Sequence, residues 1–211
     1  MEPQQAKDAL LAAILPDVPF DGWTDAALAR AAERVGLESA ELRSLCPRGV
    51  RDLVAWFSHW ADRETMRALE ARDLSTLKVR ERIATGVQTR LSVLAPHREA
   101  VRRALALLSA PQNLALGARL LYDAVDAIWY AAGDTATDFN FYTKRALLAG
   151  VYGATTLYWL DDRSAESADT LNFLDRRLND IMTIPRVTKR IRAWMPRLPD
   201  PFLFFRLARR R

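Results

Sequence analysis

The stretch ALARAAERVGLESAELRSLCPRGVRDLVAWF, residues 27–57, decides the fold. Its apolar residues recur every three or four positions, which is typical of helices that bury one face. Thr24 is placed to cap a first helix, Gly36 to end that helix in a left-handed conformation, and Pro47 to break a short second helix. The stretch therefore predicts three successive helices, over residues 25–35, 39–45 and 50–71.

This pattern resembles the helix-turn-helix of TetR-type proteins, with Ala32 packed inside, Gly36 at the turn, and Leu37 and Leu42 directed inward. A ligand-responsive DNA-binding transcriptional regulator is therefore one candidate function. The charges argue against it, because a recognition helix approaches the DNA polyanion through Lys and Arg. Residues 38–45 carry two glutamates and one arginine. The sequence favours a helix-turn-helix kept as scaffold, with no nucleic-acid partner, and keeps the regulator as the alternative.

The remainder of the chain is also helical in pattern. No convincing alternating strand and no internal repeat is present in the 211 residues. An all-α bundle is therefore the expected fold class. Further helices are predicted over residues 3–15, 76–94, 96–109, 111–131, 135–161 and 165–183.

The C-terminal 27 residues differ from the rest in charge. Residues 185–211 contain nine Lys and Arg and one Asp, while the chain as a whole carries a net charge of +5. Apolar and basic side chains alternate here at helical spacing, which is the pattern of an interfacial membrane helix. A helix docked on its own body is the alternative. The predicted membrane-binding residues are Val187, Lys189, Arg190, Ile191, Arg192, Trp194 and Met195.

Catalytic and metal-binding patterns are not found in the sequence. His59 and His97 are the only histidines, and neither has the spacing of a metal site. The lone Cys46 excludes an internal disulfide and suits a reducing compartment. Phosphate-binding, dinucleotide-binding and nucleophile-elbow motifs are missing. We expect no cofactor, no metal and no enzymatic activity, with an unrecognised carboxylate-based enzyme as the remaining alternative.

An uncharged run, ALLAGVYGATTLYWL at residues 146–160, predicts a helix buried on every side. Glycines inside such a helix lower its stability and therefore need a reason. Gly150 and Gly153 either allow a neighbouring helix to approach closely or leave space for an apolar ligand. The residues themselves leave both readings open, a plain core and a pocket.

A longer stretch, YAAGDTATDFNFYTKRALLAGVYGATTLYWLDDRS at residues 130–164, closely resembles the ubiquinone-biosynthesis accessory family, that of the ninth coenzyme Q protein of mitochondria and its alphaproteobacterial relatives. The resemblance extends over about residues 9–184, and its GD-x-x-TDFN-x-YTKR core is specific. The sequence departs from the family at Phe141 and Leu171, where Trp is usual.

The resemblance implies a TetR-like all-α homodimer with a vestigial helix-turn-helix and a C-terminal amphipathic helix. It implies a non-enzymatic protein that binds a polyprenyl quinone or phospholipid and partners the di-iron demethoxyubiquinone hydroxylase. The expected location is cytoplasmic, peripheral on the inner face of the bacterial plasma membrane. The expected parts are residues 1–60 with the helix-turn-helix, residues 61–184 for lipid binding and dimerisation, and the tail 185–211.

Two sets of site residues follow from this resemblance. The uncharged helix and the amphipathic helix before it are expected to form the lipid-binding cavity, through Leu121, Val125, Trp129, Leu148, Val151, Tyr152 and Thr155. Carried over onto the matching motif, the partner-binding surface consists of Asp138, Phe141, Tyr142 and Arg145. Phe141, Tyr142 and Arg145 are expected to share one exposed face of the first helical turns.

Overall fold

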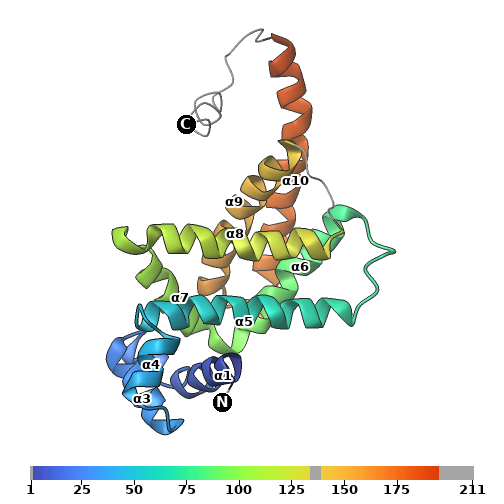
Figure 1. The fold of residues 1–211 in the computed structure, drawn as a ribbon. Coiled ribbons are helices and arrows are strands. Elements are labelled where there is room, and N and C mark those ends of the chain that lie inside the picture. The colour runs from blue at the N-terminus through green and yellow to red at the C-terminus, as the bar shows by residue number, and fades with distance from the viewer. Residues whose placement is uncertain (1, 134–138, 195–211) are drawn as a thin grey trace, which may run out of the picture.

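The fold was described from a computed structural model, which covers residues 2–133 and 139–194 and places side chains at residues 2–133 and 143–181. Within these ranges the chain forms helices and no strand, which confirms the predicted all-α class (Figure 1). The N-terminal helices are α1 (Pro3–Ile14), α2 (Val18–Asp21), α3 (Asp25–Arg34), α4 (Ser39–Leu45) and α5 (Val50–Glu70). The later ones are α6 (Val79–Leu94), α7 (Arg98–Leu108), α8 (Leu114–Ala131), α9 (Phe139–Asp161) and α10 (Ala168–Trp194).

The helix-turn-helix forms as predicted, and its local geometry explains why. The Thr24 hydroxyl caps α3 by accepting from the Ala27 amide at 3.2 Å, and Gly36 ends the helix at a φ of +71°. The Asp25 carboxylate accepts from the Val50 amide at 2.8 Å and so joins the start of α3 to the start of α5. A Cβ at Gly49 would lie 2.3 Å from that carboxylate, so a larger residue does not fit there.

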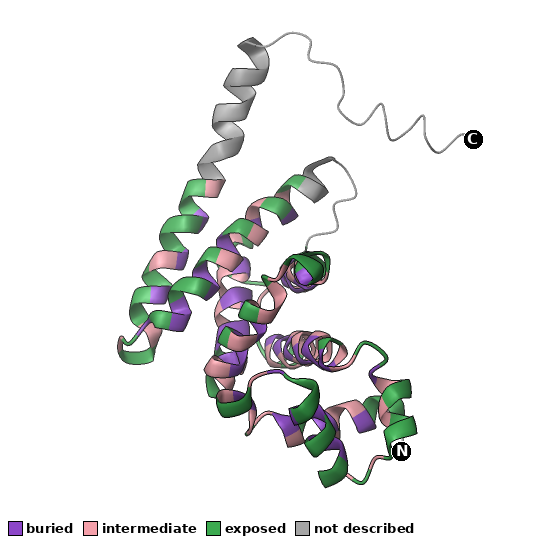
Figure 2. Ribbon diagram, turned by 90° about the vertical axis from the view of Figure 1, so that its left-hand side faces the viewer, coloured by how far each residue is buried: buried purple, intermediate pink, exposed green. Residues whose placement is uncertain are grey.

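One hydrophobic cluster runs through the whole molecule. It includes buried residues of α1, α3 and α5 as well as residues of α6, α8, α9 and α10. Figure 2 shows the buried faces of these helices turned toward one another. Trp23 reinforces the connection by donating from Nε1 to the Ala100 carbonyl of α7 at 2.9 Å. The helix-turn-helix is therefore packed into the same core as the rest of the chain.

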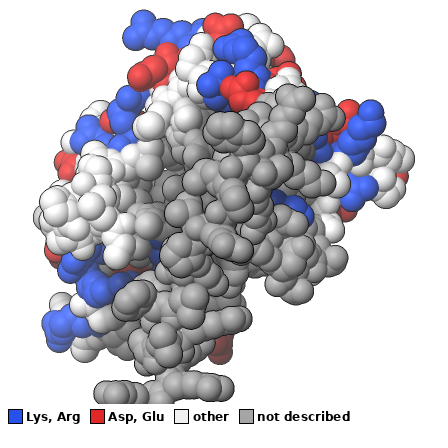
Figure 3. Space-filling model, turned by 90° about the horizontal axis from the view of Figure 1, so that it is seen from above, with Lys and Arg blue, Asp and Glu red and all other residues white. Residues whose placement is uncertain are grey.

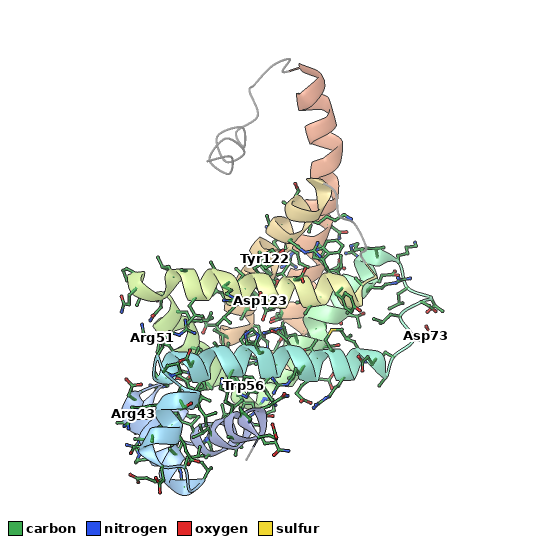
Figure 4. All side chains as sticks on the ribbon, in the orientation of Figure 1. Arg43, Arg51, Trp56, Asp73, Tyr122 and Asp123 are labelled. Atoms are coloured by element: carbon green, nitrogen blue, oxygen red, sulfur yellow. The ribbon has the colours of Figure 1, made fainter. Side chains whose placement is uncertain are left out.

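Polar contacts also fix α1 on α5. The Asp8 carboxylate accepts from Trp56 Nε1 at 2.8 Å and from Arg63 at 2.7 Å. The Arg63 guanidinium lies over the Trp56 ring, 4.5 Å from its centroid. Figure 4 labels Trp56 on α5, above α1.

Two elements, α2 and α10, depart from the sequence prediction. The sequence gives no helix between Pro16 and residue 24, yet α2 forms there, with Pro19 in its first turn where its missing N–H is not needed. A helix was also predicted to end near residue 183, whereas α10 continues through Pro185. A proline removes one helical hydrogen bond, but its fixed φ is compatible with a helix.

The expectation that residues 146–160 are buried on every side is wrong. The helix itself is present as part of α9, but Leu157 and Tyr158 are 60% and 40% exposed, and Gly150 and Ala154 are also exposed. The absence of charge therefore marks an apolar outer face of α9 as well as its buried inner face.

The corner between α9 and α10 is organised by one carboxylate. Asp162 Oδ1 accepts from the Ser164 amide at 2.8 Å and from its hydroxyl at 2.6 Å. Asp162 Oδ2 accepts from the Thr170 amide at 2.9 Å and from its hydroxyl at 2.5 Å. The sequence predicts a turn here, and the structure shows that the turn is held by a buried hydrogen-bonding centre.

Candidate functional site: an apolar cavity between α5 and α9

A cavity of about 510 Å³ lies among α5, α6, α7, α8 and α9. This volume is within the range of small-molecule sites, about 300–1,000 Å³. Most of its lining is aliphatic or aromatic, and the polar side chains in it are Ser58, Arg90, Ser109, Tyr152 and Thr156. Its apolar lining consists of Val54, Phe57, Leu94, Val101, Ala104, Leu105, Leu108, Leu114, Gly117, Ala118, Leu120, Leu121, Ala124, Gly153 and Leu157.

The cavity opens to the surface at one side and ends in the core at the other. Leu114 and Leu157 are lining residues that remain 56% and 60% exposed, so they mark the mouth. Val54 and Phe57 of α5 are only 2% and 4% exposed and mark the inner end. An apolar chain that enters between α8 and α9 would therefore reach the core at α5.

Gly153 is one reason that this space exists. A Cβ built at Gly153 meets no atom within 4 Å, so this glycine leaves space and does not serve close helix contact. Gly117 differs, because a Cβ there would lie 3.4 Å from Leu108 Cβ, in the tight contact between α7 and α8. The sequence left two readings of Gly153 open, close helix contact and space for a ligand. The structure shows space.

A buried charged group lies at the inner end of the cavity. Arg90 is 4% exposed, and its Nε donates to Asp62 Oδ1 at 2.9 Å while Nη1 donates to the Tyr152 hydroxyl at 2.6 Å. Nη2 reaches the Ser58 hydroxyl at 3.2 Å. Burial works against the charged guanidinium, but attraction from Tyr152 and Asp62 outweighs it and keeps the pKa of Arg90 above its ordinary value.

Sequence reasoning missed this group. The helical pattern of residues 76–94 places Arg90 away from the apolar stripe, whereas the structure buries it against α5 and α9. Its partners Asp62 and Tyr152 lie 28 and 62 positions away in the sequence. The spacing of charges within one helix gives no signal for such a contact.

The arginines of the helix-turn-helix are mostly held by carboxylates. Arg30 pairs with Asp21, Arg34 with Asp17 at 2.5 Å, and Arg48 with the first turn of α5. The hydrogen bond from Arg34 keeps the pKa of Asp17 below its ordinary value, so the carboxylate is charged at neutral pH. These pairs weaken the region as a polyanion-binding surface.

Charges of both signs are also interspersed on the face seen in Figure 3. An uncharged patch bordered by charged side chains lies at the left-hand edge of that face, on the side where Figure 1 places the corner between α7 and α8. That corner is also the location of Leu114 at the cavity mouth. The described surface there is suited to apolar contact.

Neither histidine belongs to a group of metal ligands in the part of the chain that the structure describes. No group of three or more His, Cys, Asp or Glu in that part could hold a metal ion. His97 packs edge-on against Phe57 and Trp60, with ring centroids 6.1 and 5.6 Å apart, and its partial burial lowers its pKa. Cys46 is buried, and this burial raises the pKa of its thiol. Both side chains therefore serve packing.

Comparison with solved structures identifies the fold. The chain superimposes on a TetR transcriptional regulator from Nitrosomonas europaea with a TM-score of 0.66 and 20% identity, over 82% of this chain and 95% of that one. The predicted TetR-like fold is confirmed. A sequence identity of 20% supports a shared fold and no shared function.

Sequence comparison finds similarity to one family. A family model described as COQ9 matches residues 114–185, which contain α8, α9 and most of α10. The chain is 36% identical over 197 residues to the Ubiquinone biosynthesis protein COQ9, mitochondrial, of Rattus norvegicus, with 90% of this chain and 63% of that protein covered. It is 34% identical over 197 residues to the Homo sapiens protein of the same name, with 90% and 62% covered. The chain is thus similar to COQ9 proteins over 90% of its own length. It spans somewhat less than two thirds of the length of these curated relatives.

The COQ9 family model covers both helices to which the lipid-binding residues were assigned, and the structure divides those residues into two groups. Leu121 and Tyr152 line the cavity. The other five are buried in the core and are not among its lining residues, namely Val125, Trp129, Leu148, Val151 and Thr155. The cavity lies nearer to α5 and α7 than the sequence pattern indicates.

The predicted partner surface is described only in part. Asp138 lies outside the described residues, and the side chains of Phe141 and Tyr142 lie outside the described side chains. The expectation that Arg145 shares an exposed face is wrong, because Arg145 is 4% exposed and its Nε donates to Asp126 at 2.5 Å. The ion pair between α8 and α9 holds this guanidinium inside.

The predicted membrane-binding residues also lie outside the described side chains, and Met195 lies outside the described residues altogether. Of the helices in the described ranges, none is both long and apolar enough to cross a membrane. Leu171, where the sequence departs from the family, is 37% exposed on α10.

Proposed function

We propose that this chain is a lipid-binding accessory protein of ubiquinone biosynthesis, which presents polyprenylated quinone intermediates to the di-iron demethoxyubiquinone hydroxylase. The observation that carries the proposal is the apolar cavity between α5 and α9, with its mouth at Leu114 and Leu157. The family relationship supports the pathway, because the curated relatives are named ubiquinone biosynthesis proteins.

The physical need for such a protein follows from the solubility of the intermediate. A polyprenyl chain has a large apolar surface, and each 100 Å² that leaves a hydrocarbon environment for water costs about 2.5 kcal/mol. A cavity lined by leucine, valine and phenylalanine replaces that environment for the part of the molecule it encloses. The protein would thereby lower the cost of moving the reactive ring out of the bilayer.

The tail would bring the cavity to the membrane. In the sequence, nine basic residues follow position 184, and each basic residue near anionic lipid contributes about 1 kcal/mol. We therefore place the protein at the inner face of a membrane as a peripheral protein. Flotation with anionic vesicles tests this part, and unchanged flotation after deletion of residues 185–211 would contradict it.

Lipid content is the direct test of the proposed function. Mass spectrometry of the purified protein under native conditions is expected to show a co-purifying polyprenylated phenol or quinone. An empty protein that also fails to take up such a compound from vesicles would contradict the proposal.

The partner is tested separately. A pull-down with the hydroxylase is expected to be weakened by Tyr142→Lys and by Phe141→Lys, because aromatic side chains dominate binding at interfaces. Retention of full binding by both variants would contradict the partner surface and leave lipid binding in place.

A further inference from the structure

The inner end of the cavity contains hydroxyl groups that lack acceptors. Tyr152 is 6% exposed, and its hydroxyl accepts from Arg90 Nη1 at 2.6 Å. Within the described residues no acceptor lies in hydrogen-bond range of its own proton. The Ser58 hydroxyl is in the same situation, since it accepts from Arg90 at 3.2 Å and donates to no described group. Both residues line the cavity.

Arg90 also has an unused hydrogen-bond donor. A guanidinium carries five N–H donors, and Nη1 carries two of them. One Nη1 hydrogen is directed to Tyr152, and no second acceptor is found for this nitrogen within the described part of the chain. Unsatisfied buried donors are costly, so an oxygen atom arriving in the cavity would be stabilised by all three side chains.

The charges of Arg90 and Asp62 decide whether the arriving oxygen belongs to a charged or an uncharged group. Arg90 is already compensated by Asp62, whose Oδ1 lies 2.8 Å from Nη2, so the buried pair has no net charge. An arriving carboxylate or phosphate would leave one buried negative charge without a partner, which is costly in the interior. An uncharged oxygen acceptor uses the free donors without that penalty.

We infer that Ser58, Arg90 and Tyr152 form a head-group site, which recognises an uncharged carbonyl or phenolic oxygen at the end of an apolar chain. This inference rests on the proposed function and adds the orientation of the ligand while it is held, with the head group inward and the chain toward the mouth, so that presentation to the hydroxylase follows release from the cavity. Arg90 and Tyr152 determine specificity by ranking neutral ring head groups above lipid anions.

The test uses the full-length protein and displacement of an environment-sensitive apolar fluorophore by three probes. The probes are a short-chain ubiquinone, an isoprenoid hydrocarbon of matched length, and a fatty carboxylate. The wild type is expected to bind the quinone most tightly. Tyr152→Phe keeps the ring and is expected to weaken quinone binding about tenfold, as the loss of one buried hydrogen bond does, with hydrocarbon binding unchanged.

Thr155→Val is the matched control. Thr155 lies on the same helix but in the core and not on the cavity lining, and its hydroxyl donates to the Val151 carbonyl at 2.7 Å, so its removal is expected to change neither affinity. Ser58→Ala provides a second variant of the site, with the same selective loss.

The head-group site would be overturned by any of the following outcomes. Equal weakening of quinone and hydrocarbon by Tyr152→Phe would indicate a packing role, and a fatty carboxylate that binds more tightly than the quinone would reverse the charge argument. In both cases the proposed lipid-binding function stands. If none of the three probes displaces the fluorophore, the head-group site and the proposed function fail together.

Discussion

At Gly153, α9 passes the cavity without a side chain, and this position offers a direct way to fill the space. Gly153→Leu is expected to weaken binding of an apolar ligand at least tenfold, because four carbon atoms would enter the cavity. Gly150→Leu is the control, since a Cβ at Gly150 also meets nothing within 4 Å but Gly150 is not a lining residue.

Both glycine variants gain helix propensity of up to about 1 kcal/mol, so neither is expected to unfold the protein. Displacement of the apolar fluorophore, with thermal unfolding measured in parallel, separates the two effects. Equal binding by both variants would show that the space beside Gly153 does not hold the ligand.

Asp162 is the residue whose loss is expected to cost the most stability at the corner between α9 and α10. Hydrogen bonds from the side chains of Ser164 and Thr170 outweigh the effect of burial and hold the pKa of Asp162 well below its usual value. Asp162→Ala removes these bonds and is expected to lower the free energy of unfolding by roughly 2 kcal/mol at pH 7.

The pH dependence of this effect has a definite sign. Because the pKa is depressed in the folded state, the stabilisation is complete above the ordinary pKa of about 3.9 and is lost as the pH falls below it. Urea unfolding at pH 7 and at acid pH is expected to show the difference between wild type and Asp162→Ala shrinking with acidity. Asp161→Ala is the control, since that carboxylate is 80% exposed and its pair with Arg102 contributes little.

Among the elements, the helices with strong local signals were predictable from sequence. Thr24, Gly36 and the apolar spacing gave α3 and its turn, and the structure confirms both. The errors of the sequence prediction concern which residues of other helices pack against each helix. Arg90 is buried because α5 and α9 supply Asp62 and Tyr152, and a pattern read along α6 contains neither partner.

The cavity was one of two readings that the sequence left open, and its position among the helices was not predictable. An uncharged helix with glycines was compatible with space beside α9, and Tyr152 and Leu121, which were assigned to lipid binding, are among the residues that line the cavity. The contributions of α5 and α7 depend on how the helices cross, which residue spacing within one helix does not determine. For the same reason Val125 and Leu148, which were assigned to the lining, lie in the core.

The charge pairs of α3 lead to a prediction about DNA. The intact chain is expected not to retard a random duplex at low salt, because Arg30 and Arg34 are paired with Asp21 and Asp17. Arg43 and Arg51, both labelled in Figure 4, are the arginines of this region without an ion pair among the described contacts. Clear, salt-sensitive retardation by the wild type would restore the regulator as the function.

The double variant Asp17→Asn, Asp21→Asn provides the internal comparison for this experiment. It releases two guanidinium groups without altering the helices and is expected to bind the duplex measurably more strongly than the wild type at low salt. Identical behaviour of the two proteins would show that these pairs do not suppress DNA binding.

At the scale of the molecule, the outer faces of α8 and α9 carry exposed aromatic and aliphatic side chains beside charged ones such as Arg119. Tyr122, Tyr130 and Leu157 are 41%, 73% and 60% exposed, and Figure 4 labels Tyr122 on this side of α8. Exposed apolar surface of this kind marks an interaction site in soluble proteins. We expect a homodimer formed through this surface, with twice the 23.9 kDa mass of the chain in light scattering.

Tyr130→Glu is expected to shift this dimer toward monomer, since a buried carboxylate without a partner is costly. Phe20→Glu is the control, because Phe20 is 84% exposed but lies on α2, away from α8 and α9. A monomeric wild type, or equal dissociation in both variants, would contradict the assignment.

The position of the cavity mouth has a kinetic consequence. Leu114, Ala118 and Tyr122 are spaced four residues apart on α8, so the rim of the cavity and the exposed apolar face form one continuous strip. Two copies associated through this strip would cover each other's entrance. Ligand exchange would then be gated by subunit dissociation, and the rate at which bound lipid leaves would fall as the protein concentration rises.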